Sequence, residues 1–435
     1  VRVATHQRLR ESLLEDNRGD DVSDNKLSGA WLLLKNFFVR NPFLSQKTDL
    51  LFYGTGRRKK YEDGLWWDIY HDPVMESMEE NCLLWERPYN VSHLTPPKTS
   101  NLRHVDLAEY TGTLLQKLGV SRISFSGEEV SLIKDVEDEI LSRFGVEVPL
   151  MSIVKEDLSK RKIRLPLYRR LIRRVDPNIA LLTVSYLGRE TFVEACQSEN
   201  VPVVELQHGA ISRYHMGFSF PYDKKNVFPD HFFSFGDFWA RLVDLPLPDE
   251  NIHSVGYPYL EKESGKYDEV EKKDQTIFIS QPTVGEELSR FAVELNDQER
   301  YENDVIYKLH PREYDSWKKK YPWLRESDVR VVDKDEPPLY RLFAESKAQV
   351  GVGSTALYEG LNFGLKTHVL DIPEEKHKLE PLIEEGYAEL VSSTQELLDH
   401  SEIGGDGAFD AKSVFEDNAV EKVAESLRTI REDGG

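Results

Sequence analysis

The chain has 435 residues, of which 77 are acidic and 56 are basic, giving a formal net charge of −21 at pH 7. This sign argues against nucleic acid as a partner, because lysine and arginine must replace the counterions of the phosphates. A dense carboxylate surface fits either a salt-rich (halophilic) cytoplasm or an ordinary acidic cytosolic enzyme. The length exceeds that of one ordinary core and predicts two domains of about 150 to 250 residues each.

The cysteines and the hydropathy narrow the class of protein further. Only two cysteines occur, Cys82 and Cys196, and neither has a partner at metal-ligand spacing, so neither a disulfide framework nor a metal site is expected. The longest apolar run, from Ala30 to Val39, is far shorter than the roughly 20 residues that a membrane helix needs. The residues after Val1 lack the apolar core of a signal peptide. We therefore expect a cytoplasmic protein.

Through the first 262 residues, short apolar runs alternate with helical patterns. Apolar positions at helical spacing occur at 7–15, 27–39, 107–118, 130–144 and 189–198. Runs typical of buried strands occur at 49–53, 122–125, 179–184 and 201–206. Strands alternating with helices at this spacing predict a parallel sheet flanked by helices.

A second series follows a charged linker at 261–274. Its predicted strands are 276–280, 304–309, 329–332, 348–352 and 367–370, and its predicted helices are 286–296, 339–346 and 355–363. The sequence therefore predicts two doubly wound, Rossmann-like α/β domains, residues 1–262 and 270–435, facing each other across a cleft. The last helix is expected either to stay with the second domain or to pack back on the first.

One motif predicts a phosphate site in the second domain. The predicted strand at 348–352 leads into Gly353, and Ser354 and Thr355 begin the next helix. Free N–H groups at a helix start bind phosphate, and Gly353 lets the backbone approach a ligand closely. Glu359, about one and a half turns further on, could accept hydrogen bonds from ribose hydroxyls. The alternative is an ordinary capped strand–helix junction with an exposed glutamate.

Two histidines follow predicted strands in the same way. His310 precedes a proline and lies between the cationic Lys308 and Arg312, so its imidazole could stabilise a departing diphosphate. His208 ends a strand of the first domain, and Gly209 allows a tight turn there. It could take the proton of an acceptor hydroxyl or donate to a phosphate. The alternatives are a loop histidine for His310 and a structural histidine for His208.

Weaker signals complete the candidate set. Ser280 and Gln281 end the first strand of the second domain, where small polar loops often touch a donor phosphate. The loop 54–56, Gly-Thr-Gly, is a plausible acceptor-side loop, although it lacks the features of a Walker sequence. Four arginines at 169–174 form a basic helical region, which is either a charge-balanced solvated face or a peripheral contact with anionic lipid at the inner face of a membrane.

These motifs occur in an order that resembles the GT-B-fold transferases of capsules and surface polysaccharides, including the Kdo and polysialic-acid transferases. More distantly, the order is similar to the CDP-glycerol glycerophosphotransferases. The motifs are Gln207-His208-Gly209, 229–236, 255–258, 308–311 and 353–359. The resemblance spans roughly residues 200 to 372 and does not reach the first 180 residues. One departure is Leu309, where proline is common.

The resemblance implies that His310, Ser354 and Thr355 hold the phosphates of the donor, with Glu359 at the ribose, and that His208 is a base or a phosphate contact. The leading hypothesis is a metal-independent glycosyltransferase that moves a sugar from a nucleotide-sugar donor to a glycan or lipid-linked acceptor, without a further cofactor. The alternatives are a CDP-polyol phosphotransferase, a nucleotide-sugar 2-epimerase of the same fold, and a non-catalytic binding protein.

Overall fold

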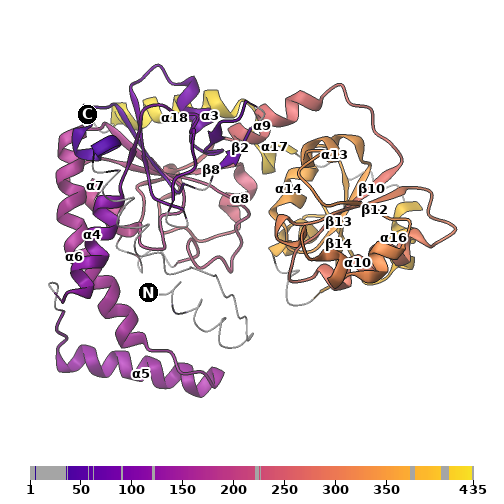
Figure 1. Cartoon of the computed structure of the whole chain (residues 1–435), viewed down its shortest axis with the longest axis horizontal. Helices are drawn as coiled ribbons and strands as arrows, with labels where there is room; N and C mark the ends of the chain where they lie inside the picture. The colour runs from indigo at the N-terminus through magenta and orange to yellow at the C-terminus, as the bar shows by residue number, and fades with distance from the viewer. Residues whose placement is uncertain are drawn as a thin grey trace.

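The computed structural model describes residues 5, 36 and 38–433, apart from 57, 62, 90–91, 120–122, 221–224, 226, 373–377 and 403–410. The helix predicted at 7–15 and most of the one predicted at 27–39 lie outside the described residues. Two lobes make up the chain, one in the first part of the sequence and one in the second (Figure 1).

The first lobe contains a seven-stranded parallel sheet with the order β5-β4-β1-β6-β7-β8-β9. Its strands are β1 (Leu50–Gly54), β4 (Cys82–Glu86), β5 (Leu102–His104), β6 (Ile179–Leu182), β7 (Val203–Leu206), β8 (His231–Ser234) and β9 (Ile252–Ser254). The strand predicted at 122–125 is wrong, because residues 123–125 lead directly into a helix whose start is capped by Ser126 and Glu129. The apolar residues of this segment therefore belong to the loop before the helix and do not pair with a sheet.

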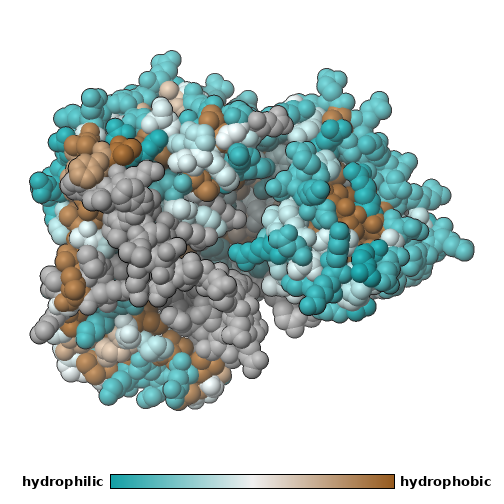
Figure 2. Space-filling model, in the orientation of Figure 1, coloured by the Kyte–Doolittle hydropathy of each residue, from teal (hydrophilic) through white to brown (hydrophobic). Residues whose placement is uncertain are grey.

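Helices cover this sheet on both faces. They are α3 (Asp72–Ser77), α4 (Asp106–Lys117), α5 (Gly127–Phe144), α6 (Leu150–Val175), α7 (Glu190–Ser198), α8 (Asp237–Arg241) and α9 (Pro258–Ser264). The 26-residue α6 was predicted only in its arginine-rich part; it packs against α4 and α7 and buries Tyr168, Leu171 and Ile172. Helix α5 projects from the lobe, and apolar colour is visible at that end of the surface (Figures 1 and 2).

The second lobe contains a six-stranded parallel sheet with the order β12-β11-β10-β13-β14-β15. Its strands are β10 (Gln275–Ile279), β11 (Asp304–Lys308), β12 (Arg330–Val332), β13 (Ala348–Gly351), β14 (Lys366–Leu370) and β15 (Glu389–Val391). Its helices are α10 (Gly285–Asn296), α11 (Trp317–Lys320), α12 (Pro322–Glu326), α13 (Leu339–Glu345), α14 (Thr355–Leu361), α15 (Glu380–Glu384) and α16 (Thr394–Glu402).

Both sheets share one topological feature. The strand order reverses direction between β1 and β6 in the first sheet and between β10 and β13 in the second. Such a switch point opens a crevice at the carboxyl ends of the strands, where doubly wound sheets bind ligands. The predicted fold class, two doubly wound Rossmann-like domains, is thereby confirmed.

The end of the chain returns to the first lobe. Helices α17 (Ala411–Val414) and α18 (Ala419–Asp433) contact α8, α3 and α9. The indole of Trp239 donates to the carbonyl of Val414 at 2.7 Å. Val423, Leu427 and Ile430 enter the apolar core beneath the first sheet, and Figure 1 shows α18 in yellow along that lobe. The predicted linker at 261–274 is partly helical, because α9 and a 3-10 turn (Gly265–Tyr267) occupy its first half.

An apolar cluster joins the two lobes. Phe238 and Tyr259 of the first lobe and Ile277 and Tyr358 of the second are buried in the same cluster. The space-filling view shows a notch between the lobes (Figure 2). The coloured surface of the two lobes in this view is mostly hydrophilic. The lobes are therefore in direct contact, and their facing loops form the candidate site.

Candidate active site

The carboxyl edge of the second sheet brings together three predicted segments. Ser280 and Gln281 follow β10, Gly353 and Ser354 follow β13 across the switch point, and His310 follows β11 on the other side of β10. Ser354 is the N-cap of α14, and its hydroxyl accepts the backbone N–H of Ala356 at 3.3 Å. Segments far apart in sequence thus line one edge because parallel strands all end there.

The ring of His310 is held by its own turn. Its Nδ1 accepts the backbone N–H of Arg312 at 3.1 Å, so in the neutral ring the proton is on Nε2. The backbone N–H of His310 donates to Glu313 Oε2 at 2.9 Å, and Tyr321 donates to Glu313 Oε1 at 2.6 Å. Glu313 is fully buried. Its role was not predicted, although its position three residues after a capping residue is that of a capping box.

Other predicted donor-side residues have partners of their own. The amine of Lys308 donates to the hydroxyl of Tyr314 at 2.8 Å and to the carbonyl of Lys334, and burial lowers its pKa. Ser280 is buried, and its hydroxyl contacts that of a β11 tyrosine at 3.0 Å. Arg312 is exposed. Donor binding by these three residues stays a prediction, and the contacts of Lys308 favour a role in holding the loop after β12.

Glu359 faces the first lobe from α14. Its Oε2 accepts the hydroxyl of Tyr340 at 2.8 Å. Burial raises the pKa of Glu359 to about 7, although that bond and the nearby charge of Lys59 oppose the rise. Lys59 lies on β2 (Lys59–Lys60) of the first lobe, and its amine donates to the hydroxyl of Tyr259 at 2.8 Å. The carboxylate is thus near the junction of the lobes, and its predicted contact with a ribose stays untested.

The turn after β7 touches the start of α14. Gln207 shapes this turn, because its amide donates to the carbonyl of Gly209 at 2.9 Å and accepts the N–H of Phe235 at 2.8 Å. The backbone N–H of Ala210 donates to the hydroxyl of Thr355 at 3.4 Å. A Cβ on Gly209 would lie 3.6 Å from that same hydroxyl. The two predicted motifs therefore meet across the lobes.

Aromatic side chains surround His208. The hydroxyl of Tyr186 lies 3.3 Å from His208 Nε2 and 3.4 Å from His215 Nε2, and Phe218 packs nearby. The hydroxyl of Tyr70 donates to the carbonyl of His208 at 2.5 Å. Burial lowers the pKa of His215 to about 4, so that ring is neutral at pH 7. The Nδ1 of His215 accepts the backbone N–H of Gly217 at 3.2 Å, so the proton of the neutral ring is on Nε2. His215 can therefore donate to the hydroxyl of Tyr186, and that hydroxyl can donate to His208.

Strained backbone holds Tyr186 at this place. Val184 and Leu187 have φ of 63° and 59°, values that cost side-chain-bearing residues about 1–3 kcal/mol each. The N–H of Ser185 donates to Glu205 Oε1 at 3.0 Å, and Arg189 donates to the carbonyl of Val184 at 3.2 Å. Burial raises the pKa of Glu205 to about 7. Such strain at the carboxyl end of β6, beside the switch point, is typical of functional loops.

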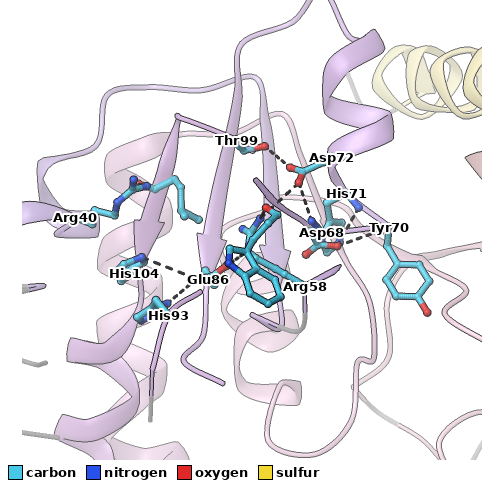
Figure 3. Close-up of polar contacts among 12 residues, drawn as sticks. Arg40, Arg58, Asp68, Tyr70, His71, Asp72, Glu86, His93, Thr99 and His104 are labelled. Atoms are coloured by element: carbon cyan, nitrogen blue, oxygen red, sulfur yellow. Dashed lines mark hydrogen bonds and ion pairs between the residues drawn. The ribbon is translucent and has the colours of Figure 1, made fainter. Parts of the chain in front are cut away.

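A buried ionic network lies behind the loop 54–56 (Figure 3). Arg58 donates through Nε to Glu86 Oε2 at 2.5 Å, and its Nη1 lies 3.5 Å from Asp72 Oδ2. Burial and the charge of Asp68 raise the pKa of Asp72 to about 6. Gly56 has φ of 70°, and a Cβ there would lie 2.4 Å from a backbone carbonyl, so glycine is required. The network supports the loop, whose predicted contact with an acceptor is untested.

The basic region of α6 is partly neutralised. Arg169 and Arg173 both pair with Glu199, at 2.6 and 3.0 Å. This pairing favours the interpretation as a charge-balanced face, and membrane contact stays a prediction. Among the described residues, no helix is both long and apolar enough to cross a bilayer.

Sequence comparison finds neither a matching protein-family model nor a matching curated protein. Solved structures do share the fold. UDP-GlcNAc 2-epimerase from Neisseria meningitidis bound to UDP-GlcNAc is similar with a TM-score of 0.51 and 13% identity over 87% of this chain and 99% of that chain. UDP-GlcNAc 2-epimerase from Methanocaldococcus jannaschii is similar with a TM-score of 0.52 and 10% identity, again over 87% of this chain and 99% of that chain. The wall teichoic acid polymerase TagF has a TM-score of 0.47 and 9% identity over 99% of this chain and 97% of that chain.

Because the sequence identities are this low, the structural similarity establishes the fold alone. The chain has the GT-B-like architecture of two facing Rossmann-like domains, and its structural neighbours are enzymes. The narrower resemblance to capsule transferases stays a prediction.

Proposed function

We propose that this chain is a glycosyltransferase that uses a nucleotide-sugar donor, with the donor on the second domain and the acceptor on the first. The observation that carries the proposal is the contact between the carboxyl edges of the two sheets, at Ala210 and Thr355. It brings a histidine turn of one sheet against a phosphate-type helix start of the other. A donor diphosphate at Thr355 would then lie beside an acceptor at His208.

In this mechanism the protein's own donors hold the leaving nucleotide. The Nε2–H of His310 and the hydroxyls of Ser354 and Thr355 would stabilise the charge that develops on the phosphate. An acceptor hydroxyl would lose its proton to His208, and the hydroxyl of Tyr186 would hold that ring in place. No divalent ion is assigned to the transfer step, which the addition or removal of Mg²⁺ tests.

A second candidate is a nucleotide-sugar 2-epimerase. The specific observation in its favour is the set of proton-carrying groups after β6 and β7, where the hydroxyl of Tyr186 lies 3.3 Å from His208 Nε2 and 3.4 Å from His215 Nε2. An epimerase needs groups that remove and return a proton at one sugar carbon. It needs no acceptor, and this difference separates the two proposals.

The deciding experiment is a calorimetric titration with UDP, GDP, CDP, CMP and dTDP, with and without Mg²⁺, on the wild type and on His310→Ala. His253→Ala is the matched control, since His253 is a half-buried histidine at the far edge of the first sheet. We expect one nucleotide to bind in the absence of Mg²⁺, with weaker binding only in His310→Ala. Absence of binding by any nucleotide contradicts the proposal.

The reaction is then followed with the matching nucleotide-sugar. Release of nucleotide that depends on added glycan acceptor supports the transferase. Rearrangement of the sugar without any acceptor identifies the epimerase, and transfer of a polyol phosphate from a CDP-linked donor identifies the phosphotransferase.

A further inference from the structure

A second group of histidines lies at the outer edge of the second sheet. His368 is on β14, Glu389 lies opposite it in register on β15, and His400 is in the last turn of α16. The Nδ1 atoms of His368 and His400 lie 3.2 and 3.4 Å from the same atom, Glu389 Oε2. We call these three residues the edge triad.

The three facing atoms of the edge triad are not satisfied by hydrogen bonds. His368 Nδ1, His400 Nδ1 and Glu389 Oε2 are enclosed, and none has a hydrogen-bond partner among the described residues. His368 is 1% exposed, so water cannot readily serve its ring. Buried polar atoms are normally bonded, and three facing exceptions require an explanation. A bound cation that accepts all three lone pairs would supply one.

The distances fit a divalent transition metal. Zinc binds imidazole nitrogen and carboxylate oxygen at about 2.0–2.2 Å, which in a tetrahedron separates the ligand atoms by roughly 3.3–3.6 Å. The separations within the edge triad are 3.2 and 3.4 Å to the shared oxygen, and all three ligand atoms lie within 4.8 Å of one another. Two imidazoles and one carboxylate form a ligand set that zinc and its neighbours favour over magnesium or calcium.

A neighbouring lysine orients the carboxylate of the edge triad. Lys366 lies 3.3 Å from the other oxygen of Glu389 and donates to the carbonyl of His400 at 2.6 Å. It therefore orients the carboxylate from behind, as outer partners of metal ligands commonly do.

We propose that the edge triad binds one divalent transition metal of the zinc class, with water completing the coordination. Lys366 and Glu389 are the first residues of their strands, whereas the cleft lies at the carboxyl ends. The metal is therefore on the opposite edge of the sheet from the transfer site, and it would fasten α16 to β14 and β15. This role does not depend on the proposed function.

Another histidine cluster differs from the edge triad in its hydrogen bonds (Figure 3). Glu86, His93 and His104 are equally close. His93, however, bonds Glu86 through Nδ1 at 2.6 Å and Asp106 through Nε2 at 3.0 Å, and despite burial these bonds raise its pKa. Arg58 occupies the second oxygen of Glu86, and the two imidazoles stack face to face. Both ring nitrogens of His93 are engaged by carboxylates, which leaves neither for a metal, so we assign no metal there.

The test uses the full chain with any affinity tag removed. Chelated protein is titrated with Zn²⁺ and with Co²⁺, and bound metal is counted by elemental analysis. We expect one equivalent of zinc, a thermal midpoint that rises with it, and visible absorption of tetrahedral Co²⁺. His400→Gln should lose all three, whereas the control His253→Gln should retain them.

The design separates metal binding from folding. His400 is half exposed, so the variant should fold like the chelated wild type, as judged by circular dichroism. If it does not fold, Glu389→Gln provides the same comparison, because the amide keeps the shape but binds metal poorly. Absence of a stoichiometric metal in the wild type, or retention of metal by the folded variant, overturns the proposal. Nucleotide binding by the zinc-free protein should be unchanged, which keeps this test distinct from that of the proposed function.

Discussion

The carboxyl edges of the two sheets have the same topology but are built differently. On the second sheet, His310 and Ser354 lie directly after their strands and are held by neighbours in sequence, His310 by Arg312 and Glu313 and Ser354 by Ala356. On the first sheet, His208 is surrounded by residues from separate loops, among them Tyr70 and Tyr186. The loops that follow the strands of the donor side are therefore shaped by residues close in sequence, whereas the surroundings of His208 on the acceptor side depend on residues far apart in sequence.

The largest expected effect comes from His208→Ala. If His208 accepts the proton of the acceptor, turnover should fall by about 10²–10⁴-fold, the usual contribution of a general base. Nucleotide affinity should stay within a factor of about two, because the donor side is built separately. Release of nucleotide from the donor sugar measures the first quantity and calorimetry the second.

The control for this variant is Tyr214→Phe, an exposed aromatic residue of the same loop. Equal losses of nucleotide affinity and turnover in His208→Ala would contradict the proposal that the donor binds the second sheet and the acceptor the first.

His310→Ala should weaken nucleotide binding. Loss of a hydrogen bond to a charged phosphate costs about 1.5–3 kcal/mol, which weakens nucleotide binding by roughly 10–100-fold. Glu313→Gln should give an intermediate loss, because the amide still accepts one of the two bonds that hold the turn. Calorimetric dissociation constants check both. Unchanged affinity in His310→Ala would remove this residue from the donor side.

The buried carboxyl group of Glu205 should make the stability of the protein depend on pH. The folded pKa of Glu205 is about 7, above its ordinary 4.5, so as pH rises the unfolded state releases its proton first. Glu205 therefore costs stability progressively between pH 4.5 and 7, and fully above pH 7, by up to about 3 kcal/mol. Glu205→Gln should remove this slope while its oxygen still accepts the N–H of Ser185.

Urea unfolding at about pH 5 and pH 8 measures this effect, and Glu359→Gln, with a pKa shift of the same sign, is the parallel variant. An unaltered slope in Glu205→Gln would show that its carboxyl group is not held in a dry environment.

The smallest effect is expected from Arg213→Ala. Arg213 pairs with Glu384 across the two lobes at 2.8 Å, but both side chains are more than half exposed. Exposed pairs contribute about 0–1 kcal/mol, so the thermal midpoint should change little and added salt should remove the difference. A loss above about 2 kcal/mol would mean that this pair, rather than the apolar cluster, holds the lobes together.

Part of the candidate site was accessible from sequence because its signals are local. Gly353 and Ser354 are adjacent to a strand and a helix cap, and parallel strands place such junctions on one edge. The aromatic surroundings of His208 carried no local signal. Tyr186 depends on the positive φ of Val184, and a β-branched residue gives no hint of that conformation. The edge triad was likewise missed, since its ligands lie on two strands and a helix and have no motif spacing.

The sequence by itself determined the doubly wound class and the order of the strand-end motifs, because hydrophobic periodicity and helix caps act over a few residues. Only the tertiary structure decided which motifs face each other, where α18 packs, and that Lys308 bonds the loop after β12. The physical reason is that burial and charge pairing depend on residues distant in sequence. The same dependence brings Ala210 to Thr355 across the lobes, and His400 towards His368.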